Sequence, residues 1–353
     1  MTEAAASTSR PGLLERLDAG PVLCAEGYLF ELERRGYLQA GAFVPEVVLD
    51  HPEQVTALHR DFVRAGSDVV EALTYYAHRE KLRAVGKDGL LEDMNRQALA
   101  LAREVADESG TLLAGNVCNT NLYDPDNSET RAQTRAMFEE QVGWAAQAGV
   151  DFVIGETFRY AAEASIALEV IHASDLPAVI TLAVGQQPDT REGNSLSDAC
   201  RRLEDEGAAV VGLNCIRGPA TMLPLLGAIV AAVSSPVAAL PVPYRTTDDQ
   251  PTFQSLREAD PSLLPDGRPF PTALDPFMCN RYEVADFTVQ AQAAGVRYFG
   301  LCCGAGPHHV RSMAEALGRT QEASRYSVDM SKHAFFGTAP GLQEHNREYR
   351  DRL

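Results

Sequence analysis

The sequence is poor in positive charge, and lysine is almost absent from it. Lys81, Lys87 and Lys332 are its only lysines, and 31 Lys and Arg stand against 49 Asp and Glu, which gives a formal net charge of -18. The acidic residues are spread along the chain and do not gather in one tail. Because such a surface repels phosphate backbones and anionic lipids, we expect neither nucleic acid nor a membrane among the partners.

Long hydrophobic runs and a disulfide framework are also missing. No stretch approaches the roughly 18 uninterrupted apolar residues of a membrane-spanning helix, and the first residues lack the apolar core of a secretion signal. The 7 cysteines are odd in number and show no framework spacing, which is typical of proteins from a reducing compartment. These absences predict a cytoplasmic location.

Short apolar runs do alternate with amphipathic stretches, which indicates strands that alternate with helices. The expected strands are residues 21–24, 68–73, 112–117, 151–154, 178–184, 209–213, 236–240 and 296–301. The expected helices lie near residues 52–65, 91–108, 130–148, 161–172, 195–206, 221–233, 282–294 and 308–317. Because eight strand-helix units close a parallel barrel, we predict an α/β domain, a (β/α)8 TIM barrel over residues 12–318. A doubly wound open sheet is the alternative.

Three segments lie outside this alternation. Residues 1–11 are expected to be disordered. The segment 243–280 follows the seventh strand and is rich in Pro and Asp, and its length predicts a lid or a binding element. Residues 319–353 form a C-terminal extension that we expect to pack on a partner subunit in a homodimer or larger homo-oligomer, with wrapping of its own barrel as the alternative.

Three cysteines close predicted strands. Cys215 follows Val-Gly-Leu-Asn, and the adjacent Cys302 and Cys303 follow Gly-Leu and precede Gly304. The carboxyl ends of barrel strands meet at one face, and three thiolates that meet there would make a Zn²⁺ site with an open fourth position. The alternative is that a cysteine is a small buried core residue, which is our interpretation of the remaining four, Cys24, Cys118, Cys200 and Cys279.

The other residues at the predicted strand ends are carboxylates, amides and aromatics, without a basic cluster. They are Glu26, Gly27, Thr74, Tyr75, Tyr76, Asn116, Asn119, Glu156, Asn214 and Tyr244. This set disfavours a substrate dominated by phosphate. Aromatic faces and carboxylates attract onium cations, and an onium compound is a methyl donor. Together with a zinc-bound thiol nucleophile, the pattern predicts methyl transfer onto sulfur.

Four stretches resemble the zinc-dependent homocysteine S-methyltransferases, and most closely the betaine-homocysteine branch. They are residues 33–46, 58–67, 212–215 and 300–304. The similarity runs from about Pro21 to Leu317 and continues faintly at Asp329-Met330 and Glu348-Tyr349. The resemblance implies transfer of a methyl group from a betaine-like or sulfonium donor to the thiol of homocysteine, which forms methionine.

The resemblance also implies roles for individual residues. Cys215, Cys302 and Cys303 would bind Zn²⁺. Glu156 would be the catalytic-site residue that binds the amino group of homocysteine, and Phe43 and Tyr76 would contact the onium group. The remaining substrate-binding residues that we expect are Glu26, Gly27, Thr74 and Asn214.

The chain departs from the family pattern at two positions. The first strand of the family ordinarily ends in Asp-Gly-Gly or Asp-Gly-Ala, and this chain has Ala25-Glu26-Gly27. Thr157 stands where the betaine enzymes have Tyr. The alternatives are therefore the same chemistry with another thiol acceptor, or a zinc-binding homologue without catalysis. A zinc hydrolase would be expected to offer histidine ligands, but no predicted strand end carries one.

Overall fold

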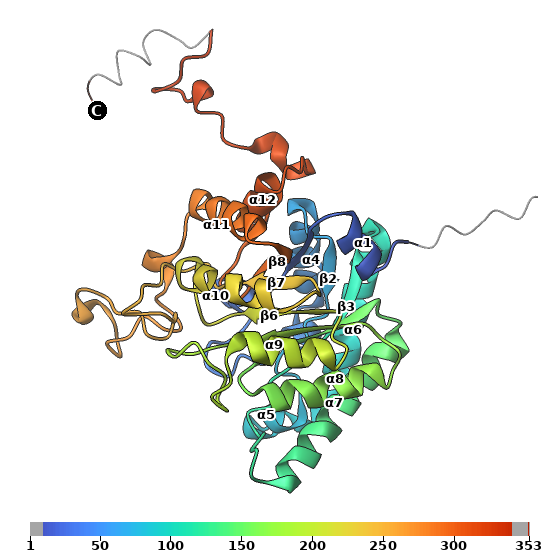
Figure 1. Cartoon of the computed structure of the whole chain (residues 1–353). Coiled ribbons are helices and arrows are strands. Elements are labelled where there is room, and N and C mark those ends of the chain that lie inside the picture. The colour runs from blue at the N-terminus through green and yellow to red at the C-terminus, as the bar shows by residue number, and fades with distance from the viewer. Residues whose placement is uncertain (1–9, 341–351, 353) are drawn as a thin grey trace, which may run out of the picture.

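The computed structural model describes residues 10–340 and residue 352. Eight parallel strands form a closed barrel in which neighbours in sequence are neighbours in space (Figure 1). The strands are β1 (Val22–Ala25), β2 (Val69–Glu71), β3 (Leu112–Cys118), β4 (Phe152–Phe158), β5 (Ala178–Leu182), β6 (Val210–Asn214), β7 (Val237–Leu240) and β8 (Val296–Leu301). The predicted (β/α)8 barrel is confirmed, and the open sheet is excluded because β1 pairs with β8.

A helix follows each strand and packs on the outside of the barrel. These outer helices are α4 (Pro52–Ala65), α6 (Leu91–Ser109), α7 (Ser128–Ala148), α8 (Ala161–His172), α9 (Leu196–Asp205), α10 (Pro219–Ala232), α11 (Arg281–Ala293) and α12 (Pro307–Ala316). The sequence accounts for the ends of these helices. In α4, for example, Pro52 is the first residue, and Gly66 caps the C-terminus with a φ of +117°, a conformation that glycine adopts without strain.

Four further α-helices in the described part of the chain are not predicted from the sequence. They are α1 (Leu13–Ala19), α2 (Tyr28–Arg34), α3 (Val47–Asp50) and α5 (Arg79–Ala84). Each has at most two turns, which is too short for an apolar stripe of helical period to stand out from the sequence.

The core is layered around the barrel wall. Inside the barrel, apolar side chains of the strands pack together with Leu13 and Leu17, so α1 closes the amino end. At the carboxyl end, Cys215 and Cys302 pack with Tyr244 and Phe253 of the segment 243–280. This segment therefore covers the face on which the predicted site residues meet.

The chain first follows the barrel after α12 and then leaves it. Residues 319–340 contain η4 (Glu322–Tyr326) and η5 (Met330–Lys332). Arg319 pairs with Asp68 over 2.6 Å, and Glu322 of η4 pairs with Arg64 of α4 over 3.1 Å, whereas the residues after η4 extend away from the barrel (Figure 1). Met330 and Phe336 are both more than half exposed. The faint family similarity at Glu348-Tyr349, and residues 1–9 of the segment 1–11 that is predicted to be disordered, lie outside the described part of the chain.

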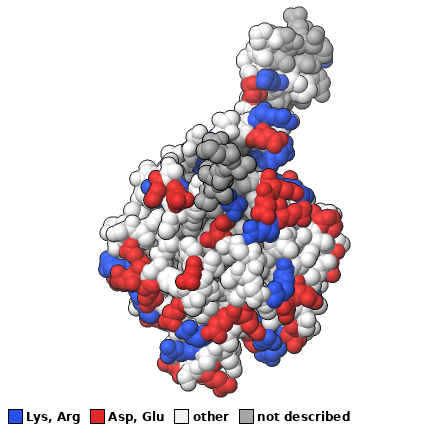
Figure 2. Space-filling view, turned by 90° about the vertical axis from the view of Figure 1, so that its right-hand side faces the viewer, with Lys and Arg blue, Asp and Glu red and all other residues white. Residues whose placement is uncertain are grey.

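The surface carries both signs of charge. On the face drawn in Figure 2, acidic and basic side chains are interspersed, and no continuous basic area is visible. In the described part of the chain, no helix combines the length and the apolar character that crossing a membrane requires.

Candidate active site

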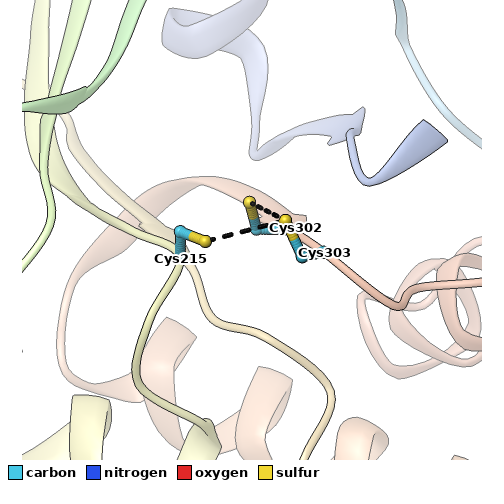
Figure 3. A group of neighbouring side chains, drawn as sticks. All are labelled: Cys215, Cys302 and Cys303. Atoms are coloured by element: carbon cyan, nitrogen blue, oxygen red, sulfur yellow. Dashed lines mark hydrogen bonds between the residues drawn. The ribbon is translucent and has the colours of Figure 1, made fainter. Parts of the chain in front are cut away.

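The three predicted metal ligands meet at the carboxyl end of the barrel. Their side chains turn toward one another, Cys215 from the segment after β6 and Cys302 and Cys303 from the segment after β8 (Figure 3). The Sγ atom of Cys303 lies 3.8 Å from that of Cys215 and 3.8 Å from that of Cys302. All three sulfur atoms lie within 4.8 Å of one another.

The backbone fixes this cluster. Cys215 and Ile216 both have positive φ angles, 57° and 60°, so the chain turns sharply at the end of β6. The amide of Cys215 donates a 2.9 Å hydrogen bond to the carbonyl of Leu240, and the amide of Cys302 donates one of 2.9 Å to Pro241. Because Leu240 and Pro241 are neighbours at the end of β7, one short segment holds both ligand loops in place.

The geometry fits a zinc ion. Zn–S bonds of about 2.3 Å in a tetrahedron separate the sulfur atoms by about 3.8 Å, which agrees with the two sulfur distances. Contacts with the sulfur atoms of Cys302 and Cys303 lower the pKa of Cys215 well below its usual range. Contacts with the sulfur atoms of Cys215 and Cys303 raise the pKa of Cys302. The cluster thus already favours a thiolate at Cys215.

A small acidic cavity of about 30 Å³ lies on one side of the cluster. It is lined by Glu26, Glu71 and Glu156, with Asn116 beside them and Cys302 and Cys303 at its edge. None of the described residues that line it is basic. Glu26 Oε2 and Asn116 Oδ1 are buried there without a hydrogen-bond partner among the described residues. A ligand with several N–H donors and a positive charge would satisfy these atoms.

Glu156 is held at the centre of a buried network. Asn116 Nδ2 donates to Glu156 Oε1 over 2.7 Å and to Glu71 Oε1 over 2.5 Å. Asn214 Nδ2 donates to Glu156 Oε2 over 2.6 Å, and the Thr157 hydroxyl donates to the same oxygen over 3.1 Å. Both oxygens of Glu156 are thus fixed, and further bonds to them from a ligand would be oriented by the network.

A strand irregularity aims this side chain. The sequence predicts the fourth strand at residues 151–154, but β4 continues to Phe158, so Glu156 lies within the strand. The pairing of β4 with β5 shifts by one residue between Gly155 and Phe158, where Thr157 has a φ of 62°. Such a bulge redirects a side chain next to an active site.

Burial and mutual repulsion keep these carboxyl groups from ionising together. Burial raises the pKa of Glu156 to about 7, against the opposing effect of its hydrogen bond from Asn116. Burial, and then the charge of Glu156, raise the pKa of Glu26 and of Glu71. A cationic ligand in the cavity would favour the ionised forms of all three.

An aromatic cavity of about 120 Å³ also borders the cluster. Cys215 and Cys303 line it together with six rings, those of Phe30, Phe43, Tyr75, Tyr76, Phe253 and Phe270. Phe30 and Phe43 stack with their centroids 5.1 Å apart, and Phe253 meets Phe270 edge to face at 4.9 Å. Rings grouped in this way suit an onium cation.

The structure brings most of the predicted site residues together. Glu26, Gly27 and Glu156 line the acidic cavity, and Phe43 and Tyr76 line the aromatic one. Asn214 lines neither cavity and instead binds Glu156.

Thr74 is not brought into either cavity. Its hydroxyl donates a 2.8 Å hydrogen bond to the carbonyl of Asn116, so it is turned toward β3.

Glu26 lies one position after the end of β1. Its carboxyl group nevertheless comes within 4.8 Å of the carboxyl group of Glu156 and of the sulfur atom of Cys302.

Glu71 and the rings of Phe30, Phe253 and Phe270 line the cavities without having been predicted from the sequence. A single charged residue within the apolar run 69–73 was the available signal for Glu71. Phe253 and Phe270 lie in the irregular segment 243–280, where no periodicity marks a side chain as facing the site.

Replacing Gly27 by Ala is expected to disturb the cysteine cluster. At a φ of +89°, an added Cβ would lie 2.6 Å from the carbonyl oxygen of Cys302. We expect a loss of about 1–3 kcal/mol in the free energy of unfolding and a lower metal content, measured by denaturant titration and elemental analysis. Gly36→Ala is the matched control, because Gly36 has a φ of +80° with no atom near its added Cβ. Equal metal content in the two variants would contradict this account.

Comparisons with known proteins identify the family of the chain. The sequence model of the homocysteine S-methyltransferase family matches residues 27–317. Betaine-homocysteine S-methyltransferase 1 from Xenopus tropicalis is 36% identical over 352 residues, which span 97% of this chain and 83% of that protein. S-methylmethionine-homocysteine S-methyltransferase from Pongo abelii is 33% identical over 338 residues, 94% of this chain and 87% of that protein.

The fold has a counterpart among solved structures. The homocysteine methyltransferase MmuM from Escherichia coli, in its metallated form, superposes with a TM-score of 0.64 at 22% identity, over 84% of this chain and 96% of that one. At this identity the likeness concerns the barrel alone. The family match and the two relatives carry the assignment: the chain belongs to the homocysteine S-methyltransferase family and is a methyltransferase.

Proposed function

We propose that this methyltransferase moves a methyl group from an onium donor to the thiol of homocysteine across the cysteine cluster. One observation carries the proposal: the two cavities meet at the cluster. Cys302 lines only the acidic cavity, Cys215 only the aromatic cavity, and Cys303 lines both. An acceptor on the acidic side and a donor on the aromatic side would therefore meet at the sulfur atoms.

The acidic cavity would hold the amino group of homocysteine. An ammonium group offers three N–H donors, and the free acceptors of Glu26 and Asn116 lie beside Glu156. In this proposal Glu26 takes over from the Asp that the family usually carries at the end of the first strand. Glu71 and Asn116 extend the same subsite.

The aromatic cavity would hold the onium group of the donor. The relatives are named for two donors, betaine and S-methylmethionine, and both present a methyl group on a positively charged atom. The rings of Phe43, Tyr76 and the segment 243–280 would surround that charge, and the methyl group would face Cys215 and Cys303.

The three cysteines would hold Zn²⁺, in keeping with their tetrahedral spacing and with the metallated form of a protein of the same fold. Bound there, zinc would keep the homocysteine sulfur as a thiolate near neutral pH. The sulfur then attacks the methyl carbon, a C–S bond forms, and the bond from the methyl group to the onium atom breaks with its electron pair going to that atom. The donor leaves as a neutral amine or thioether, so no proton has to be supplied to it.

Membership of the family favours homocysteine over another thiol and a transferase over a non-catalytic homologue. The test is methionine formation by the purified protein with homocysteine and, in turn, glycine betaine, dimethylsulfoniopropionate and S-methylmethionine. Methionine from at least one donor, with about one zinc per chain, is the expected result. Zinc without methionine from any donor would contradict the proposal.

Replacing Phe43 by Leu is expected to weaken use of the donor and to spare the acceptor. A cation-π contact contributes about 0.5–2 kcal/mol, so kcat/KM for the donor should fall about 3- to 30-fold while KM for homocysteine stays constant. Phe43→Trp is the control, since it keeps an aromatic face. A uniform effect of both substitutions on both substrates would count against an onium site at Phe43.

We also propose that residues 319–353 pack on a partner subunit. Met330 and Phe336 are exposed apolar side chains on this arm, which a second copy would cover. The mass of the protein in solution, measured by light scattering before and after truncation at Gly318, tests this; a monomer before truncation would contradict it.

A further inference from the structure

A second and larger chamber opens beside the aromatic cavity. It has a volume of about 470 Å³, and it lies between the segment after β5 and the segments after β4 and β6. Arg159, Ile216 and Gln254 line both the chamber and the aromatic cavity. The aromatic cavity, which would hold the donor, therefore continues past Arg159 into a polar space.

Arg159 has no ionic partner. It is half-buried, and neither an ion pair nor a side-chain hydrogen bond joins its guanidinium group to another described residue. It is also the only basic side chain among the described residues that line the aromatic cavity. In a chain with 49 acidic residues, an unpaired arginine at the edge of the site points to an anionic group on the ligand.

Arg191 lies in the same chamber and also lacks an ionic partner among the described residues. Its guanidinium group rests over the ring of Tyr160 at 5.7 Å, and its amide donates a 2.8 Å hydrogen bond to the carbonyl of Arg159. Among the described residues that line the chamber, Asp189 is the only acidic one, and no ion pair joins it to either arginine. Two positive charges thus face one space.

The walls of the chamber are held in place. Arg217 is almost fully buried and donates two hydrogen bonds to the carbonyl of Gly185, of 3.1 and 2.8 Å, and one of 2.8 Å to that of Gln186. The Thr190 hydroxyl accepts a 3.1 Å hydrogen bond from the amide of Asn194. The segment after β5 is therefore ordered before any ligand binds, as a binding subsite requires.

We infer that Arg159, with Arg191 behind it, binds the carboxylate of the methyl donor, so that the enzyme selects onium carboxylates over onium compounds without an acid group. This inference rests on the proposed function and narrows its donor class. The carboxylate belongs to the donor and not to homocysteine because Arg159 lines the aromatic cavity with Cys215 and is absent from the lining of the acidic one.

The test compares donors in the wild type and in Arg159→Met. Hydrogen bonds to charged groups contribute about 1.5–3 kcal/mol, so kcat/KM for glycine betaine and dimethylsulfoniopropionate should fall about 10- to 100-fold. For trimethylsulfonium, which has no carboxylate, it should change less than about 3-fold, and KM for homocysteine should stay constant. Arg96→Met is the control, because it removes an equal charge from α6, where Arg96 pairs with Glu92 over 2.6 Å.

Two results would overturn the inference. An equal loss with all donors would show that Arg159 supports the site only structurally, and a rise in KM for homocysteine alone would assign Arg159 to the acceptor. If the wild type used no donor at all, the proposed function would fail, and calorimetry without homocysteine would still decide the inference. Glycine betaine should then bind the wild type at least about 10-fold more tightly than Arg159→Met, and choline should bind both equally.

Discussion

Cys215→Ala is expected to lose its metal and its activity together. The variant would retain only two of three sulfur ligands, and two thiolates hold zinc far less tightly than three. Zinc content should fall from about one per chain to below about 0.1, and methionine formation should fall by about 1,000-fold or more, since metal activation contributes several kcal/mol. Elemental analysis after dialysis and a methionine assay measure the two quantities.

Cys200→Ala provides the control for this result. Cys200 is also fully buried, but it lies on α9, outside the sulfur cluster. This variant should keep its zinc and most of its activity, at the cost of some stability from the small cavity that it creates. If the Cys200 variant lost zinc as well, or if Cys215→Ala retained both zinc and activity, the cluster would not be the metal centre.

The barrel could be predicted from the sequence because the alternation of apolar runs with amphipathic stretches reflects which residues are buried. Strands buried on both faces appear as short apolar runs, and the helices between them carry one apolar face. The three cysteines could be found for the same reason, since a strand that ends in Cys places it at the carboxyl face. Short helices such as α2 and α5 lack enough turns for a periodic signal.

Which residues line the two cavities depends on strand register, on a bulge and on an irregular segment, and the alternation of apolar and amphipathic stretches contains none of these. Glu71 and Asn116 belong to different strands, and only the barrel register places Asn116 between Glu71 and Glu156. The bulge at Thr157 decides where Glu156 points. Phe253 and Phe270 reach the site from an irregular segment. Long-range packing thus determines which side chains line the site.

Glu156→Gln is expected to impair recognition of the acceptor selectively. The substitution keeps the size of the side chain but removes its charge, and it places an amide NH₂ where Glu156 now accepts from Asn116 on one oxygen and from Asn214 on the other. One donor would therefore face another donor in a buried site. Loss of a buried charged partner costs about 2–5 kcal/mol, so kcat/KM for homocysteine should fall about 30-fold or more.

Two comparisons separate this effect from general damage. Glu71→Gln should cost less, about 10-fold, because Glu71 accepts a single hydrogen bond from Asn116 and lies behind Glu156 in the network. An acceptor without the amino group, 4-mercaptobutyrate, should react with the wild type and Glu156→Gln at similar rates, since neither protein has an ammonium group to bind. Zinc content and KM for the donor should match the wild type. If Glu156→Gln slowed 4-mercaptobutyrate as much as homocysteine, Glu156 would act on the cluster itself and the acidic cavity would not be the amine subsite.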